Sequence, residues 1–150
     1  MAASAYLFKM ILWPSKLLSR EVQTLTACLD TIIPADITPG AVQLGVPDSI
    51  ISKSASDRKY RRLIKKGCDW LDKMAKQYNA ESFTSLSDAD RRKVVSLASE
   101  ERSNSLPGIF FKQMRSDAFY YYYANPESWI GVGYKGPPQP FGFQDYTLPQ

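Results

Sequence analysis

The sequence predicts an all-α protein with about five helices in one compact domain and an extended aromatic, proline-rich C-terminal tail. Apolar residues recur three and four positions apart along several stretches, which is the spacing of one buried face on an α-helix. Turn-forming and capping residues separate these stretches. The chain has 150 residues, enough for a single core. We divide it into an apolar N-terminal arm (1–18), a helical domain (19–124) and the tail (125–150).

The first helix is expected to run from Ser15 or Ser19 to Ile33. One apolar stripe at helical spacing predicts it: Leu18, Val22, Leu25, Leu29, Ile32 and Ile33. Pro34 ends this helix, because the residue before a proline disfavours the helical conformation. A turn-rich loop follows, and the segment Gly45-Val46-Pro47-Asp48 is expected to start a short second helix.

The third helix is expected to span about Ser56 to Tyr78. It carries a continuous apolar stripe: Tyr60, Leu63, Ile64, Gly67, Leu71, Met74 and Tyr78. The segment Ser87-Asp88-Ala89-Asp90 has an N-cap residue followed by acidic residues, which predicts the start of a fourth helix. That helix is expected to end at about Glu101.

A break from Ser103 to Gly108 is expected before a fifth helix over about Ile109 to Tyr123. Aromatic residues lie on every face of its end, which indicates that more than one side of it is covered. From Trp129 to the end, four glycines and four prolines alternate with aromatic residues. We therefore expect an extended tail without regular structure.

Histidine is absent from the chain. This removes the usual general base and excludes Ser-His-Asp and Cys-His catalysis. Asp69 and Asp72 lie among lysines, which favours ion pairs on a helix surface, and capping explains Asp88 and Asp90. Gly131-Val132-Gly133 follows no strand and precedes no helix, unlike a dinucleotide-binding loop. We therefore expect no enzyme, and no catalytic, cofactor-binding or metal-binding residue.

Cys28 and Cys68 are too far apart for a CxxC metal or redox motif. We expect two buried free thiols, with one disulfide as the alternative. Basic residues crowd the segment Arg58–Lys66, while the aromatic residues of the same helix lie on its opposite face. This arrangement favours a solvated helix face and no nucleic-acid partner. Docking to an acidic partner or to lipid headgroups is the alternative for this segment.

The tail combines proline with aromatic residues, which are the residues that most often anchor interfaces. Proline restricts the unbound chain and so lowers the cost of ordering it on binding. The tail is expected to lie across another subunit, or alternatively to wrap its own domain. With the loop after the first helix it supplies the candidate partner-binding residues: Pro34, Asp36, Pro39, Gly40, Trp129, Tyr134, Pro137, Phe141, Phe143 and Tyr146.

The N-terminal arm is apolar from Tyr6 to Trp13 but is much shorter than the ~20 residues that a membrane-spanning helix needs. It also lacks the charged start and cleavage site of a signal peptide. Two interpretations stay open: the arm covers its own core, or it lies in a membrane interface. The membrane-interface candidates are Phe8, Ile11, Leu12 and Trp13.

Two parts of the chain match a known sequence pattern. Residues 25–41 read LTACLDTIIPADITPGA, and Gly45-Val46-Pro47-Asp48 continues them. Later positions agree with the same pattern: Tyr60, Gly67, Leu71, Phe83, Leu86, Ser87, Phe110, Phe111, Tyr122, Tyr123, Gly133, Tyr134 and Gly136. Over about Arg20 to Pro138, the chain resembles the gluconate 2-dehydrogenase subunit 3 family.

The resemblance implies a small, cofactor-free, non-catalytic accessory subunit of a membrane-associated sugar or sugar-acid dehydrogenase, on the periplasmic side. In such a complex a large flavoprotein subunit carries out the oxidation and a haem c subunit passes electrons to the membrane. The small subunit supports folding, export and assembly of the large one. Partner subunits, and not this chain, would carry FAD, haem or pigments.

Family members commonly carry a twin-arginine export signal, which the N-terminal arm lacks. The pairs Arg61-Arg62 and Arg91-Arg92 lie inside expected helices. The route of export therefore stays open. So does a second interpretation, in which the chain is a structural peripheral subunit of another membrane electron-transfer complex, respiratory or photosynthetic.

Overall fold

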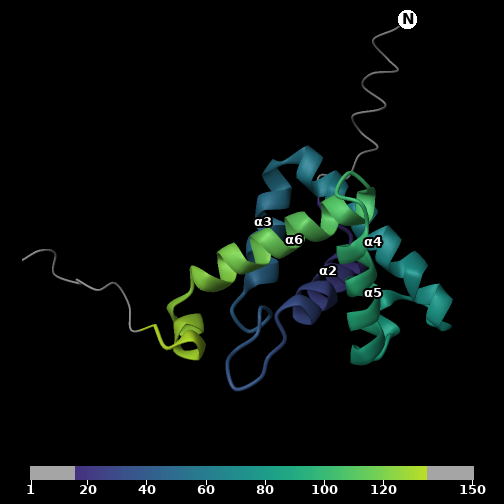
Figure 1. The fold of residues 1–150 in the computed structure, drawn as a ribbon. Coiled ribbons are helices and arrows are strands. Elements are labelled where there is room, and N and C mark those ends of the chain that lie inside the picture. The colour runs from purple at the N-terminus through teal and green to yellow at the C-terminus, as the bar shows by residue number, and fades with distance from the viewer. Residues whose placement is uncertain (1–15, 135–150) are drawn as a thin grey trace, which may run out of the picture.

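The computed structural model describes residues 16–134. Within this range the protein has five α-helices, three short 3-10 helices and no strand, which confirms the all-α class. The elements are α2 (Ser19–Ile32), α3 (Val46–Ser56), α4 (Arg58–Ala75), η1 (Lys76–Tyr78), η2 (Phe83–Ser85), α5 (Asp88–Glu100), α6 (Leu106–Tyr123) and η3 (Pro126–Val132). Figure 1 shows α6 lying across the other helices.

Side-chain caps fix where several helices begin. Asp57 precedes α4 and accepts hydrogen bonds from the backbone N–H groups of Lys59 and Tyr60 at 2.8 and 3.0 Å. Ser87 caps α5 as expected, because its Oγ accepts from the Asp90 N–H at 3.2 Å. These bonds satisfy donors that have no partner within a helix, so the local sequence alone defines these boundaries.

The start of α6 differs from the prediction. The break expected from Ser103 to Gly108 is shorter, and the helix begins at Leu106. Ser105 caps it by accepting from the Gly108 N–H at 3.2 Å. Pro107 lies in the first turn, where its missing N–H costs no hydrogen bond. The proline therefore starts the helix here and does not break it.

The expectation of an extended tail from residue 125 is also wrong for its first part. Pro126–Val132 form the 3-10 helix η3. The Asn125 side chain accepts from the Glu127 N–H at 3.1 Å and caps this helix, while Gly133 follows its end. The Asn-Pro start is a helix-initiation signal of the same kind as those that predicted the longer helices.

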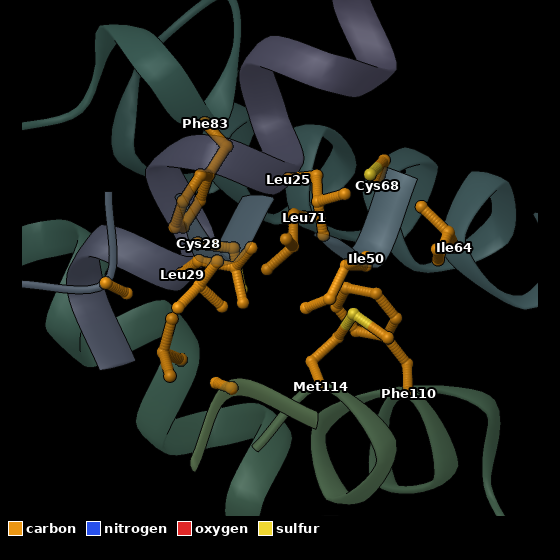
Figure 2. Close-up of a cluster of buried hydrophobic side chains, with 14 of the residues drawn as sticks. Leu25, Cys28, Leu29, Ile50, Ile64, Cys68, Leu71, Phe83, Phe110 and Met114 are labelled. Carbon is orange, nitrogen blue, oxygen red and sulfur yellow. The ribbon is translucent and has the colours of Figure 1, made fainter. Parts of the chain in front are cut away.

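The core lies where all five α-helices, α2 to α6, meet, and Figure 2 shows part of it. Its largest fully buried side chains include Leu25, Leu29, Ile50, Ile64, Leu71, Phe83, Phe110 and Met114. In Figure 2, Phe110 and Met114 reach from α6 toward Ile50. Gly67 lets the two longest helices approach, because a Cβ built there would lie 2.1 Å from Cδ2 of Phe110. The protein therefore has a single core, as its length predicts.

Cys28 and Cys68 are both buried and free, which confirms the expectation of two unbridged thiols. Burial raises the pKa of Cys28 to about 12 and also raises the pKa of Cys68, because a thiolate would lose its hydration. The Cys68 Sγ lies 3.5 Å from the backbone oxygen of Glu21. Both cysteines act as small apolar core residues.

Asp69 and Asp72 do not form the expected ion pairs with lysines of their own helix. Both bind Arg20 of α2, at 2.5 and 2.7 Å. Asp72 is buried and also accepts from the Phe83 N–H at 3.0 Å. The pairing crosses between helices because α2 packs beside α4, a juxtaposition that helical spacing alone does not reveal.

The basic segment Arg58–Lys66 is only partly a solvated face. Arg61 is buried and donates from Nη1 to the backbone oxygens of Ser54 and Ala55, at 2.6 and 3.1 Å. These carbonyls lie at the end of α3, so Arg61 caps that helix. Nζ of Lys65 lies 3.7 Å from Oε2 of Glu21 in α2. Two of the basic residues therefore hold helices together.

Candidate partner-docking surface

Two segments that the sequence marked as partner-binding come together at one end of the domain. They are the loop 34–40 after α2 and the 3-10 helix η3, the yellow-green coil in Figure 1. The Tyr122 hydroxyl donates to the Pro39 backbone oxygen at 2.8 Å. A Cβ at Gly131 would lie 2.6 Å from Cγ2 of Thr38, so a larger residue there would displace the Thr38 side chain. The loop and η3 therefore form one packed unit.

The loop is held by its own polar groups. Oδ1 of Asp36 accepts from the backbone N–H of Thr38 at 2.8 Å and from its hydroxyl at 2.9 Å. These two hydrogen bonds lower the pKa of Asp36 by stabilising the carboxylate. Asp36 therefore stabilises the turn. Gly40 is buried at the base of the loop, and Ile37 at its tip is fully exposed.

The helix η3 presents aliphatic side chains to solvent. Trp129 is half-buried: its Nε1 donates to the Tyr123 backbone oxygen at 2.8 Å, and its ring packs edge-on against Tyr134 at 5.2 Å between centroids. Ile130 and Val132 follow it in the chain and remain 79% and 61% exposed. Trp129 therefore anchors η3, while its neighbours form the outer surface.

An open hollow of about 430 Å³ lies between the loop and η3. Four exposed apolar residues line it: Ile37, Tyr123, Ile130 and Val132. We call these four residues the loop–η3 surface. Exposed aliphatic residues that gather on a rigid scaffold are typical of a protein-binding site. Sequence reasoning placed the site in these segments but missed all four residues as contacts.

The aromatic end of α6 is less covered than the sequence predicted. Tyr122 is buried, but Phe119, Tyr120 and Tyr123 are exposed, with Tyr120 at 71%. Tyr121 is half-buried and packs against the core, so this helix end is covered on the side of Tyr121 and Tyr122 and exposed at the other three aromatics. These aromatics extend the exposed apolar area beyond the hollow.

A buried carboxylate elsewhere in the domain has a structural role. Asp117 accepts from the Tyr60 hydroxyl at 2.6 Å, from Lys53 at 2.9 Å and from Gln113 at 3.0 Å. Burial alone would raise the pKa of Asp117, but these hydrogen bonds outweigh it and the pKa is lowered. Burial and the bond to Asp117 both raise the pKa of Tyr60. The group ties α3, α4 and α6 together.

Residues 19–136 match the family model described as gluconate 2-dehydrogenase subunit 3. The chain belongs to this family. Neither a curated protein nor a solved structure matches it. The match includes the loop 34–40 and all of η3, so both segments of the loop–η3 surface are part of the family's domain. Membership also associates the chain with larger dehydrogenase subunits.

Several candidate residues lie outside the part of the chain that the structure describes. They are the tail positions Pro137, Phe141, Phe143 and Tyr146 and the arm positions Phe8, Ile11, Leu12 and Trp13. Of the candidates within it, Pro34 and Tyr134 are exposed and Pro39 is half-buried.

Two structural features are absent from residues 16–134. No helix there combines the length and the apolar character needed to cross a membrane. No three side chains among its cysteines, aspartates and glutamates gather in a way that could hold a metal ion.

Proposed function

We propose that the chain is a non-catalytic accessory subunit that docks onto and stabilises a larger membrane-associated dehydrogenase of the sugar or sugar-acid type. Family membership supports the kind of partner. The observation that carries the docking role is the loop–η3 surface, four exposed apolar residues on a packed, hydrogen-bonded support. The partner carries FAD and performs the oxidation, and a haem subunit of the same complex receives the electrons at the periplasmic face of the membrane.

The stiffness of the surface favours binding. The Asp36 turn fixes the loop, and the bond from Tyr122 to Pro39 ties it to α6. Little conformational freedom is therefore lost when a partner covers Ile37. Full burial of one aliphatic side chain contributes about 1.5–3 kcal/mol. Ile37, Ile130 and Val132 together supply enough to centre a stable interface.

Stabilisation of the partner follows from the same contact. A subunit that binds only the folded form of another shifts that protein toward its folded state. The accessory chain needs no reactive group for this work. Its requirements are a rigid helical body, which the single core provides, and an apolar surface that matches the partner.

The test is co-purification from the organism that encodes the chain. The tagged full-length chain is isolated from membranes in mild detergent, co-purifying chains are identified by mass spectrometry, and sugar-acid oxidation is measured with an artificial electron acceptor. We expect a flavoprotein dehydrogenase and its activity in the eluate. The variant Ile37→Asp/Ile130→Asp should lose both.

Ile109→Asp is the matched control, because Ile109 is an exposed aliphatic residue at the opposite end of α6. It should retain the dehydrogenase. Capture of pigment-binding or quinone-site proteins would instead support the respiratory or photosynthetic alternative. Oxidation of sugar acids by the isolated chain would overturn the non-catalytic role.

A further inference from the structure

A second hollow, of about 390 Å³, lies where α2, α5 and α6 meet. Figure 1 shows α5 and α6 crossing, with α2 beside them. The apolar wall of this hollow includes Phe111 and Phe119, and its polar rim includes Arg92, Ser96 and Arg115. We call this the α5–α6 groove. It is a separate site from the hollow beneath the loop–η3 surface, since the two share no lining residue.

The rim of the groove is positively charged. Arg92 and Arg115 are exposed, and neither takes part in an ion pair among residues 16–134. The Arg115 guanidinium lies 5.9 Å from the centroid of the Phe119 ring, which holds it over the groove wall. No carboxylate lines the groove. Glu100 lies outside it and accepts a hydrogen bond from the hydroxyl of Ser96, a rim residue, at 3.1 Å. The groove therefore offers two cations beside an aromatic wall.

The groove is continuous with the loop–η3 surface. The Phe119 ring, in the groove wall, stacks on the Tyr123 ring with centroids 6.2 Å apart and planes 17° apart. Tyr123 lines the other hollow. Both rings are exposed, so an apolar path along α6 joins the two sites. A partner that covers Ile37 can thus extend one segment into the groove.

We propose that the α5–α6 groove binds an acidic amphipathic segment of the larger partner subunit. Carboxylates of that segment pair with Arg92 and Arg115, whose planar guanidinium groups match carboxylates in two-point contacts. Its apolar side chains pack on Phe111 and Phe119. The inference rests on the proposed function, because the segment belongs to the same partner. An amphipathic segment in a groove between helices is a common mode of recognition.

The first experiment tests the groove alone, with two synthetic helical peptides as probes. They carry the same leucine and phenylalanine positions, with glutamate at every polar position in one and lysine in the other. Binding to the full-length chain is measured by titration calorimetry. We expect the glutamate peptide to bind at least tenfold more tightly than the lysine peptide. Equal binding of the two, or no binding, overturns the proposal.

Charge reversal gives the sharper comparison. Arg92→Glu/Arg115→Glu should lose at least tenfold in affinity for the glutamate peptide and gain affinity for the lysine peptide. Arg102→Glu/Lys112→Glu is the matched control, because both residues are exposed, neither lines the groove and the net charge changes equally. The control should bind within twofold of the unmodified chain. An equal loss of affinity in both double variants would show that net charge alone causes the loss and would overturn the proposal.

Two further arms separate this inference from its alternatives. In the first, the same proteins are incubated with vesicles of anionic phospholipid. Retention on the vesicles that depends on Arg92 and Arg115, without peptide binding, assigns the groove to lipid and overturns the proposal.

The second arm is the co-purification assay, in which Arg92→Glu/Arg115→Glu should lose the dehydrogenase at moderate salt. If it keeps the dehydrogenase as fully as the unmodified chain does, the inference fails while the proposed function stands. If the unmodified chain captures no dehydrogenase, the proposed function fails instead.

Discussion

The contact between α4 and α6 can be tested by adding one methyl group. A Cβ at Gly67 would lie 2.1 Å from Cδ2 of Phe110, and ordinary contacts begin at about 3.4 Å. Phe110 is only 1% exposed, so its ring cannot move into solvent to make room. Gly67→Ala should therefore force the two helices apart or the ring out of its preferred rotamer.

Two effects oppose each other in this variant. Alanine is favoured over glycine inside a helix by about 0.8–1.0 kcal/mol. Overpacking a filled core costs about 1–3 kcal/mol, and an overlap of more than 1 Å belongs near the upper end of that range. The net loss of unfolding free energy should be about 1–2 kcal/mol, which lowers the melting temperature of a chain of this size by roughly 2–8 °C.

The measurement is urea and thermal unfolding of the full-length chain at pH 7, followed by circular dichroism. Phe110→Leu and the double variant complete a cycle, since the smaller side chain leaves space for the new methyl group. Gly67→Ala should then cost at least about 1 kcal/mol less in the Phe110→Leu background. Lys66→Ala, at the exposed neighbouring position, should change stability by less than about 0.5 kcal/mol. A Gly67→Ala protein that melts above the unmodified chain would refute this packing argument.

Two other predictions concern buried polar groups. Asp117→Asn should lower the unfolding free energy by about 2 kcal/mol at pH 7, because Lys53 loses its charged partner and Tyr60 a strong acceptor. The pKa of Asp117 is lowered from its ordinary value of 3.8, so its stabilising effect is complete above that value and disappears as the pH falls through the lower folded pKa. The stabilities of the two proteins should therefore begin to converge as the pH falls below ~4 and become equal only below the folded pKa, which urea unfolding at a series of pH values will measure. Cys28 and Cys68 should react with an aromatic disulfide reagent at pH 8 only when the chain unfolds, because both thiols are buried and their pKa values are raised. Rapid labelling in the absence of denaturant would contradict that account of the core.

The fold was predictable because its main signals are local. Pro34 and Ser87 mark helix boundaries whatever the rest of the chain does. The same kind of local signal marks the start of α6 and of η3: Ser105 precedes Pro107 in α6, and Asn125 precedes the first proline of η3. Proline and glycine nearby made those segments resemble breaks. Proline has opposite meanings in the first turn and in the interior of a helix, and spacing alone did not distinguish them.

The candidate site was predictable in place but not in detail. The family pattern marked the Pro34–Gly40 loop and the aromatic composition of the tail marked Trp129, and both belong to one packed unit. The exposure of Ile37 and Ile130 depends on which side of the unit faces outward, which only the assembled fold determines. The local signal for the exposure of Ile37 was its position between Asp36 and Thr38 at the tip of a turn. The ion pairs of Asp69 and Asp72 with Arg20 were not predicted for the same reason, since they depend on how α2 packs beside α4.

The central claim, that the loop–η3 surface contacts a larger dehydrogenase subunit, is tested most directly by site-specific crosslinking. A photoreactive phenylalanine derivative is placed at Ile37 of the full-length chain in the organism that encodes it, and the crosslinked protein is identified by mass spectrometry. The account predicts a crosslink from position 37 to the flavoprotein subunit and none from Ile109, at the opposite end of α6. A crosslink to that subunit from Ile109 but not from Ile37 would contradict it.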